Sequence, residues 1–217
     1  MINHSSNRVS FNLPKVYPIT DTLLSGLSHA EQVTRLIHGG ATLIQLRNKH
    51  AAPREFYHQA AAALHVTRDH GAKLIINDRV DVALALKADG VHLGQSDLQV
   101  EAARRLLGAG AIIGFSTDNV TQAKLAAKMP VDYIAFGPIF ETSTRENPDP
   151  VAGLVALREV RASIGPLPLV AIGGINPINA AEVLGAGADA LAMISELVAG
   201  PAGIEENMRK MLALVSP

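Results

Sequence analysis

The amino-acid sequence predicts an α/β fold built as a single (βα)8 TIM barrel. Three observations favour it: a unit that repeats along the chain, apolar runs without alternation, and a length of 217 residues. In each repeat an Ala-rich segment of helical period ends on a Gly or Pro corner, and a short apolar run follows at once. Since Gly supplies the left-handed residue that ends a helix, each corner marks a change from helix to strand.

The apolar runs are the expected strands. They are nearly continuous in Val, Ile, Leu and Ala, which is typical of strands buried on both faces of a parallel sheet. "KVYPITD" at residues 15–21 is the first strand and has no helix before it. The seven later runs are "HGGATLIQLR", "HGAKLIIND", "KADGVHLG", "GAGAIIGFS", "MPVDYIAFGP", "GPLPLVAIGG" and "GAGADALAMIS".

Segments of helical length and period lie between and after these runs. They span residues 28–38, 53–69, 79–87, 97–107, 119–128, 152–163, 177–185 and 202–214. Strands and helices alternating at about 27 residues per unit fit a (βα)8 barrel. The alternative, an open doubly wound sheet, usually has fewer strands and a Gly-rich turn after the first strand, where this chain has "ITDTLLSG". We therefore expect a polar arm at 1–14 and one barrel domain at 15–217.

Composition excludes several classes of protein. Nineteen basic and twenty acidic residues give a net charge of −1, which argues against binding nucleic acid or a membrane surface through overall charge but leaves room for a local anion site. The absence of Cys excludes disulfides and thiolate-bound metals and fits a reducing compartment. No apolar run reaches transmembrane length, and the start lacks the hydrophobic centre of a signal peptide. We expect a cytoplasmic protein.

Polar residues follow the expected strands. Active sites of (βα)8 barrels lie at the C-terminal ends of the strands, so this fold would bring these residues to one rim. They are Asp21, Gln45, Arg47, Lys49, Asn77, Asp78, His92, Gln95, Asp97, Ser116, Thr117, Thr142, Thr144, Arg145, Gly173, Gly174 and Ser195.

The chemistry of this set predicts two anion sites. Arg47, Lys49 and Arg145 suit phosphate oxygens, and Asp78 with Asp97 would complete a Mg²⁺ site together with phosphate and water. The second site would use backbone N–H groups at the starts of the last two helices, after "AIGG" and "MIS", helped by Thr or Ser hydroxyls. A pyrophosphate and a separate monophosphate would fill both sites.

Each element also has a purely structural interpretation. Asp78 and Asp97 are each suited to cap the helix that follows. "GGI" suits a tight turn, and His92, which lies within a strand, suits a hydrogen-bonded interior histidine. It is the joint placement of the set that favours a functional site.

Six motifs resemble the thiamine phosphate synthase family, in order, over about residues 16 to 198: "QLRNK", "LIINDRVDVALALKADGVHLGQSDL", "IIGFST", "DYIAFGPIFETSTR", "VAIGGI" and "GADALAMIS". The resemblance implies a (βα)8 enzyme that uses Mg²⁺. Such an enzyme joins 4-amino-2-methyl-5-hydroxymethylpyrimidine diphosphate to 4-methyl-5-(2-phosphoethyl)thiazole, with release of pyrophosphate. The diphosphate and the monophosphate of these small-molecule substrates agree with the two anion sites.

The resemblance also implies roles for rim residues. Arg47, Lys49 and Asn77 would hold the diphosphate, and Asp78 and Asp97 would bind the metal. The residues implied at the pyrimidine are Gln45 and Ser116, and those at the thiazole phosphate are Thr142, Thr144 and the backbone of Gly173, Gly174, Ile194 and Ser195. The implied catalytic residues are Arg47, Lys49, Ser116 and Arg145.

The chain departs from the family pattern at two positions. Arg145 stands where the family has a Lys that reaches the diphosphate, so the charge is kept but a planar fork replaces a point charge. Asn48 replaces the acidic residue commonly found between the Arg and the Lys of "QLRNK".

Two other functions stay open. The homologous thiazole tautomerases that resemble this chain lack the Gln of "QLR" and the later Asp, and carry His where this chain has Pro138. Gln45, Asp97 and Pro138 therefore favour the synthase, although "FET" is closer to the tautomerase. A barrel that binds thiamine precursors without turnover is the other alternative, and Arg145 is the reason to consider it. The sequence leaves the oligomeric state open, a homo-oligomer included.

Overall fold

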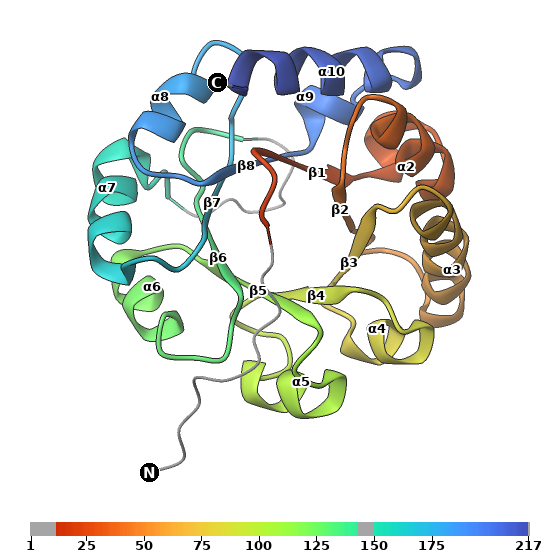
Figure 1. Cartoon of the computed structure of the whole chain (residues 1–217), viewed down its shortest axis with the longest axis horizontal. Coiled ribbons are helices and arrows are strands. Elements are labelled where there is room, and N and C mark those ends of the chain that lie inside the picture. Colours follow the sequence, from red (N-terminus) through yellow and green to blue (C-terminus); the bar gives the residue numbers. More distant parts are fainter. Residues whose placement is uncertain (1–11, 143–149, 217) are drawn as a thin grey trace.

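A computed structural model describes residues 12–142 and 150–216. In this part of the chain eight parallel strands form a closed barrel in the order β1 to β8, and helices surround it (Figure 1). The predicted (βα)8 barrel is confirmed. The division between a polar arm at 1–14 and a barrel domain stays a prediction, because residues 1–11 lie outside the described part.

The strands occur where the apolar runs predict them. They are β1 (Val16–Thr20), β2 (Leu43–Leu46), β3 (Lys73–Asn77), β4 (Gly90–Leu93), β5 (Ile112–Thr117), β6 (Tyr133–Phe136), β7 (Leu169–Ile172) and β8 (Ala190–Met193). Strand β8 closes the barrel by pairing with β1, with Val16 opposite Leu191.

One helix of the outer ring follows each strand. These helices are α2 (His29–His38), α3 (Pro53–Asp69), α4 (Val80–Leu86), α5 (Val100–Leu107), α6 (Val120–Ala126), α7 (Gly153–Ile164), α8 (Ala180–Gly185) and α10 (Ile204–Val215). Short additional helices at the strand ends are α1 (Thr22–Ser25), α9 (Ser195–Val198) and the 3₁₀ helix η1 (Pro201–Gly203).

Two helices begin three residues later than the sequence predicts. Helix α5 begins at Val100 rather than residue 97, because Asp97 Oδ2 accepts the N–H of Gly94 at 2.7 Å and holds a turn before the helix. Helix α8 begins at Ala180 rather than 177, because the side chains of Asn176 and Asn179 each accept the other's backbone N–H.

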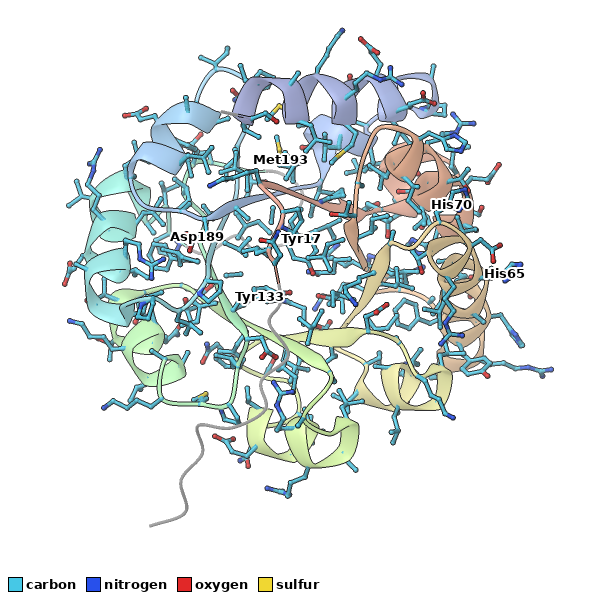
Figure 2. The ribbon with its side chains drawn as sticks, viewed as in Figure 1. Tyr17, His65, His70, Tyr133, Asp189 and Met193 are labelled. Atoms are coloured by element: carbon cyan, nitrogen blue, oxygen red, sulfur yellow. The ribbon has the colours of Figure 1, made fainter. Side chains whose placement is uncertain are left out.

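Two apolar cores result from the barrel. A large outer core fills the space between the strands and the helices. The inner core takes alternate residues of the strands, as the period of two in a β-strand requires, and Leu13 packs against it. Figure 2 shows its two largest members, Tyr17 and Tyr133, in the middle of the barrel, whereas His65 and His70 lie at the outer edge.

The described helices include none that is both long enough and apolar enough to cross a membrane.

A buried histidine joins β1 to α2. His29 Nδ1 lies 2.8 Å from Thr20 Oγ1, while its Nε2 is buried without a hydrogen-bond partner. Burial lowers the pKa of His29 to about 4, although the nearby Asp21 carboxylate acts in the opposite direction. The imidazole is therefore neutral in the folded protein at neutral pH.

We predict that His29 makes the fold sensitive to acid. The unfolded chain binds a proton on this side chain below about pH 6.5, and the folded chain does so only near its lower pKa. Stability is thus fully present above pH 6.5 and is lost as the pH falls toward 4, by about 2 kcal/mol at pH 5. Urea unfolding of the wild type and of His29→Asn at about pH 7.5 and 5 measures this. The variant should lose about 2 kcal/mol less than the wild type between the two pH values, and equal losses would contradict the assignment.

Candidate active site

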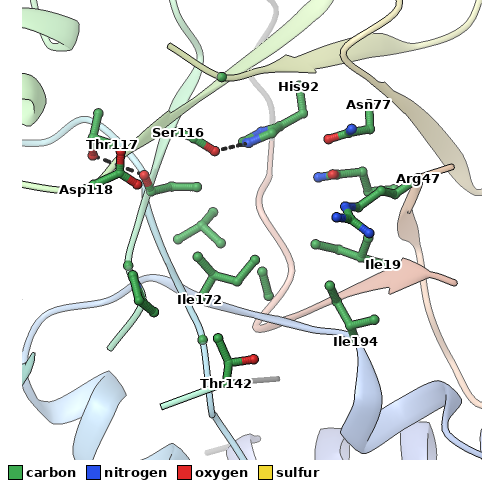
Figure 3. A pocket seen from close by; sticks show the side chains of 18 of the residues that line it. Ile19, Arg47, Asn77, His92, Ser116, Thr117, Asp118, Thr142, Ile172 and Ile194 are labelled. Carbon is green, nitrogen blue, oxygen red and sulfur yellow. Dashed lines mark hydrogen bonds between the residues drawn. The ribbon is translucent and has the colours of Figure 1, made fainter. Parts of the chain in front are cut away.

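A pocket of about 460 Å³ opens at the C-terminal ends of the strands (Figure 3). Each described residue that the sequence assigns to the site lines it. These residues are Gln45, Arg47, Lys49, Asn77, Asp78, Asp97, Ser116, Thr142, Gly173, Gly174, Ile194 and Ser195. Thr144 and Arg145 lie outside the described residues, so their positions stay predictions. The fold thus brings side chains from most of the chain to one mouth.

The two described cations of the predicted set lie beside carboxylates. Lys49 Nζ is 2.6 Å from Asp78 Oδ2, and Arg47 Nη1 is 3.6 Å from Asp21 Oδ2. Asp21 also caps α1 by accepting the N–H groups of Leu23 and Leu24. The Lys49 side chain is about half exposed, and ion pairs open to water are weak, so a bound phosphate can compete for this cation.

Neither of the predicted metal ligands caps a helix. Helix α4 has Arg79 as its N-cap and α5 has Gln99, and neither cap makes a side-chain bond. Asp78 adopts a left-handed backbone with φ of 63°, which is uncommon for a non-Gly residue. The structural alternative of two capping aspartates is therefore wrong.

Asp78 and Asp97 act on one another. Burial raises the pKa of Asp97, and the neighbouring Asp78 carboxyl raises it further, against the hydrogen bond from Gly94 N–H. Two carboxyls that share a site in this way favour a cation between them.

The donor set fits Mg²⁺ better than a metal held by protein alone. The described residues contain no group of three or more His, Cys, Asp or Glu side chains able to hold a metal. Mg²⁺ usually takes one or two carboxylates and completes its shell with water and substrate phosphates. A cation at Asp78 and Asp97 would thus depend on oxygens of a bound phosphorylated molecule.

The other side of the mouth is built from backbone. Beyond the ends of β6 and β7, Ile139 N–H donates to Ile172 O at 2.9 Å and Phe140 N–H donates to Gly173 O at 3.1 Å. These bonds hold the segment that ends in Thr142 against the turn after β7. In Figure 3, Thr142 and Ile194 lie across the pocket from His92 and Asn77.

Gly174 permits this close approach. Its φ is +64°, and a Cβ there would lie 2.5 Å from Glu141 O and 2.7 Å from Phe140 Cβ. Ser195 is the first residue of α9, and the first N–H groups of a helix have no intrahelical acceptor. Backbone and hydroxyl groups from Thr142, Gly174 and Ser195 therefore share one wall.

His92 forms part of the floor of the pocket. His92 is the hydrogen-bonded interior histidine that its position in a strand suggests, with Nδ1 2.9 Å from Tyr133 Oη and Nε2 2.8 Å from Ser116 Oγ. Burial lowers the pKa of His92 to about 4.

Tyr17 and Ile19 also line the pocket but were not predicted. Their spacing by two in "KVYPITD" is the signal that could have placed them inside the barrel.

Comparisons with known proteins match this chain to one family. The family model described as thiamine monophosphate synthase matches residues 16–197. A thiamine-phosphate synthase of Chloroflexus aurantiacus is 45% identical over 203 residues, which is 93% of this chain and 93% of the relative. One of Clostridium novyi is 46% identical over 185 residues, 85% of this chain and 90% of the relative. The solved thiamine phosphate pyrophosphorylase of Pyrococcus furiosus superposes with a TM-score of 0.81 at 39% identity, covering 93% and 97% of the two chains.

We predict that Gly174→Ala destabilises the protein by about 1–3 kcal/mol, because a non-Gly residue is strained in the left-handed region and the added Cβ meets Glu141 O. Gly185→Ala is the matched control, since Gly185 lies in α8 with no atom within 4 Å of the added Cβ. Urea unfolding of both variants measures the difference. Equal stabilities would show that the turn after β7 does not need glycine here.

Proposed function

This chain belongs to the thiamine monophosphate synthase family, and on that premise we propose that it joins 4-amino-2-methyl-5-hydroxymethylpyrimidine diphosphate to 4-methyl-5-(2-phosphoethyl)thiazole. The products are thiamine phosphate and pyrophosphate, so the chain is a transferase. One observation carries the proposal: the described residues assigned to both substrates line a single pocket.

The cationic side would hold the diphosphate through Arg47, Lys49 and Asn77. When the pyrimidine C–O bond breaks, its electron pair stays on the leaving pyrophosphate, and negative charge grows there. Cations already in place stabilise such charge without reorganisation in the transition state. Lys49, at Asp78, and Arg47, near Asp21, both line the pocket, which supports this role.

Asp78 and Asp97 would hold Mg²⁺ together with oxygens of the diphosphate. The ion, when bound, supplies further stabilisation of negative charge on the leaving pyrophosphate. The two carboxylates would also fix where the diphosphate lies relative to Lys49, because Asp78 touches that side chain.

The remaining residues would position the organic groups. Gln45 and Ser116 would bind the pyrimidine, whose electron-rich ring stabilises the carbocation left by bond cleavage. The thiazole nitrogen then forms the new C–N bond, so no protein nucleophile is needed. The residues that would hold the thiazole phosphate are Thr142, Thr144, Gly173, Gly174, Ile194 and Ser195. Catalysis would depend on orientation and electrostatics.

The tautomerase alternative finds less support in the pocket. Pro138 lines it at the position where the tautomerases that resemble this chain have histidine, and proline has no group that could move a proton. Gln45 and Asp97, which those tautomerases lack, both line the pocket.

We predict that Asp97→Asn lowers synthase activity at least roughly 100-fold, a loss typical of removing one group that stabilises transition-state charge. Asparagine can still accept the N–H of Gly94, so the turn and the fold should persist while the charge is lost. The matched control is Asp69→Asn, at the end of α3 and absent from the pocket lining. Assays of thiamine phosphate formation across Mg²⁺ concentrations measure both.

Other outcomes of this assay would overturn the proposal. Isomerisation of the thiazole without coupling would indicate a tautomerase. Binding of both precursors without turnover at any Mg²⁺ concentration would indicate a precursor-binding protein.

We also propose that Arg145 replaces the family lysine at the diphosphate. Arg145→Lys should then preserve or raise kcat, because the positive charge remains and the ammonium restores the family geometry. Steady-state kinetics measure this. A loss of tenfold or more would show that the planar guanidinium has a task that an ammonium cannot perform.

A further inference from the structure

A chain of hydrogen bonds crosses the floor of the pocket. It runs from Gln45 Nε2 to Tyr17 Oη at 3.1 Å and from Tyr17 Oη to Tyr133 Oη at 2.9 Å. Tyr133 contacts His92, and His92 contacts Ser116, whose bond is drawn dashed in Figure 3. The chain thus joins β2 to β5 through three side chains inside the barrel, and its two ends are the residues assigned to the pyrimidine.

The first bonds have a defined direction. Gln45 donates through its amide nitrogen. Within the described residues, the hydrogen-bond partners of the Tyr17 hydroxyl are this nitrogen and Tyr133 Oη. Burial raises the pKa of both tyrosines, so each keeps its single proton. Tyr17 can therefore only donate to Tyr133.

The same direction continues through the histidine. Tyr133 Oη lies 2.9 Å from His92 Nδ1, and a chain that keeps this direction has Tyr133 accepting from Tyr17 and donating to that nitrogen. A neutral imidazole that accepts at Nδ1 carries its proton at Nε2. That proton points at Ser116 Oγ, so the Ser116 hydroxyl accepts a hydrogen bond from His92. The Ser116 hydroxyl can then donate its own proton in a hydrogen bond to a ligand.

The site is built to keep this junction. Gly114 of β5 lies beside it, and a Cβ there would come 2.3 Å from Tyr133 Oη and 2.5 Å from His92 Nδ1. The rings of His92 and Tyr133 are stacked with centroids 5.5 Å apart, and both are buried.

We propose that Tyr17, Tyr133 and His92 are positioning residues that fix Ser116 as a hydrogen-bond donor and Gln45 as an acceptor toward the pyrimidine. This inference rests on the proposed function. An aminopyrimidine matches the pattern, because a ring nitrogen accepts from Ser116 while the amino group donates to Gln45 Oε1. A 4-oxo analogue offers an acceptor in place of the amino donor, and sites built on hydrogen bonds reject such mismatches strongly.

The direct test reads the proton on His92 without any substrate. In protein labelled with ¹⁵N-histidine, the two ring nitrogens of His92 are observed by NMR at neutral pH, and the resonances are assigned by their loss in His92→Gln. The proposal expects a protonated Nε2 and an unprotonated Nδ1. A protonated Nδ1 would reverse the chain and overturn the proposal.

The functional test compares the amino substrate with its 4-oxo analogue. The wild type should prefer the amino compound by about 100-fold or more in kcat/KM. Tyr133→Phe should lower this preference about tenfold or more, because His92 loses the bond that fixes its proton, while KM for the thiazole phosphate stays within about twofold. Tyr57→Phe, on the exposed side of α3, is the matched control and should change neither value.

The outcomes separate this inference from the proposed function. Lack of turnover with a protonated Nε2 would reject the proposed function but keep the hydrogen-bond direction. Normal turnover with an unchanged preference in Tyr133→Phe would reject the positioning role alone. If Tyr133→Phe does not fold, Tyr17→Phe replaces it. The same loss of preference for the amino substrate is expected in this variant, and an unchanged preference would count against the proposal.

Discussion

Closure of eight parallel strands into one barrel is the constraint on which the rest of this structure depends. A closed sheet places alternate residues of each strand in a narrow interior. The register between neighbouring strands determines which residues point inward. Here the rings of Tyr17 and Tyr133 share the inner core with aliphatic side chains and with the small Ala135, Ala190 and Ala192. Because all strands run in one direction, the polar residues at their ends meet at one mouth.

Cationic and carboxylate side chains are paired at the mouth of the pocket. Lys49 lies at Asp78 and Arg47 near Asp21, so each described cation of the set has a carboxylate partner. Asp97 adds a second carboxyl beside Asp78, at some cost in free energy, as its raised pKa indicates. Such arrangements are retained at functional sites more often than elsewhere. Across the pocket from His92 and Asn77 lie Thr142 and Ile194 (Figure 3).

Much of the fold could be predicted because glycine corners and apolar runs mark each change from helix to strand. The same pattern predicted that the polar residues after each strand would meet at one rim. The starts of α5 and α8 could not, since Asp97, Asn176 and Asn179 bond to nearby backbone and so favour turns over helix. The hydrogen-bond chain through Tyr17 and Tyr133 was also missed. Runs that are apolar on both faces do not reveal which residues point inward, and Thr144 and Arg145 stay predictions.

We propose that one mouth binds a diphosphate and a monophosphate on different walls. The decisive measurement is a crystal structure with Mg²⁺, pyrophosphate and the thiazole phosphate. We expect pyrophosphate at Arg47 and Lys49, an ion shared with Asp78 and Asp97, and the thiazole phosphate at Gly174 and Ser195. Both phosphates on one wall, or an ion bound away from the two aspartates, would contradict it.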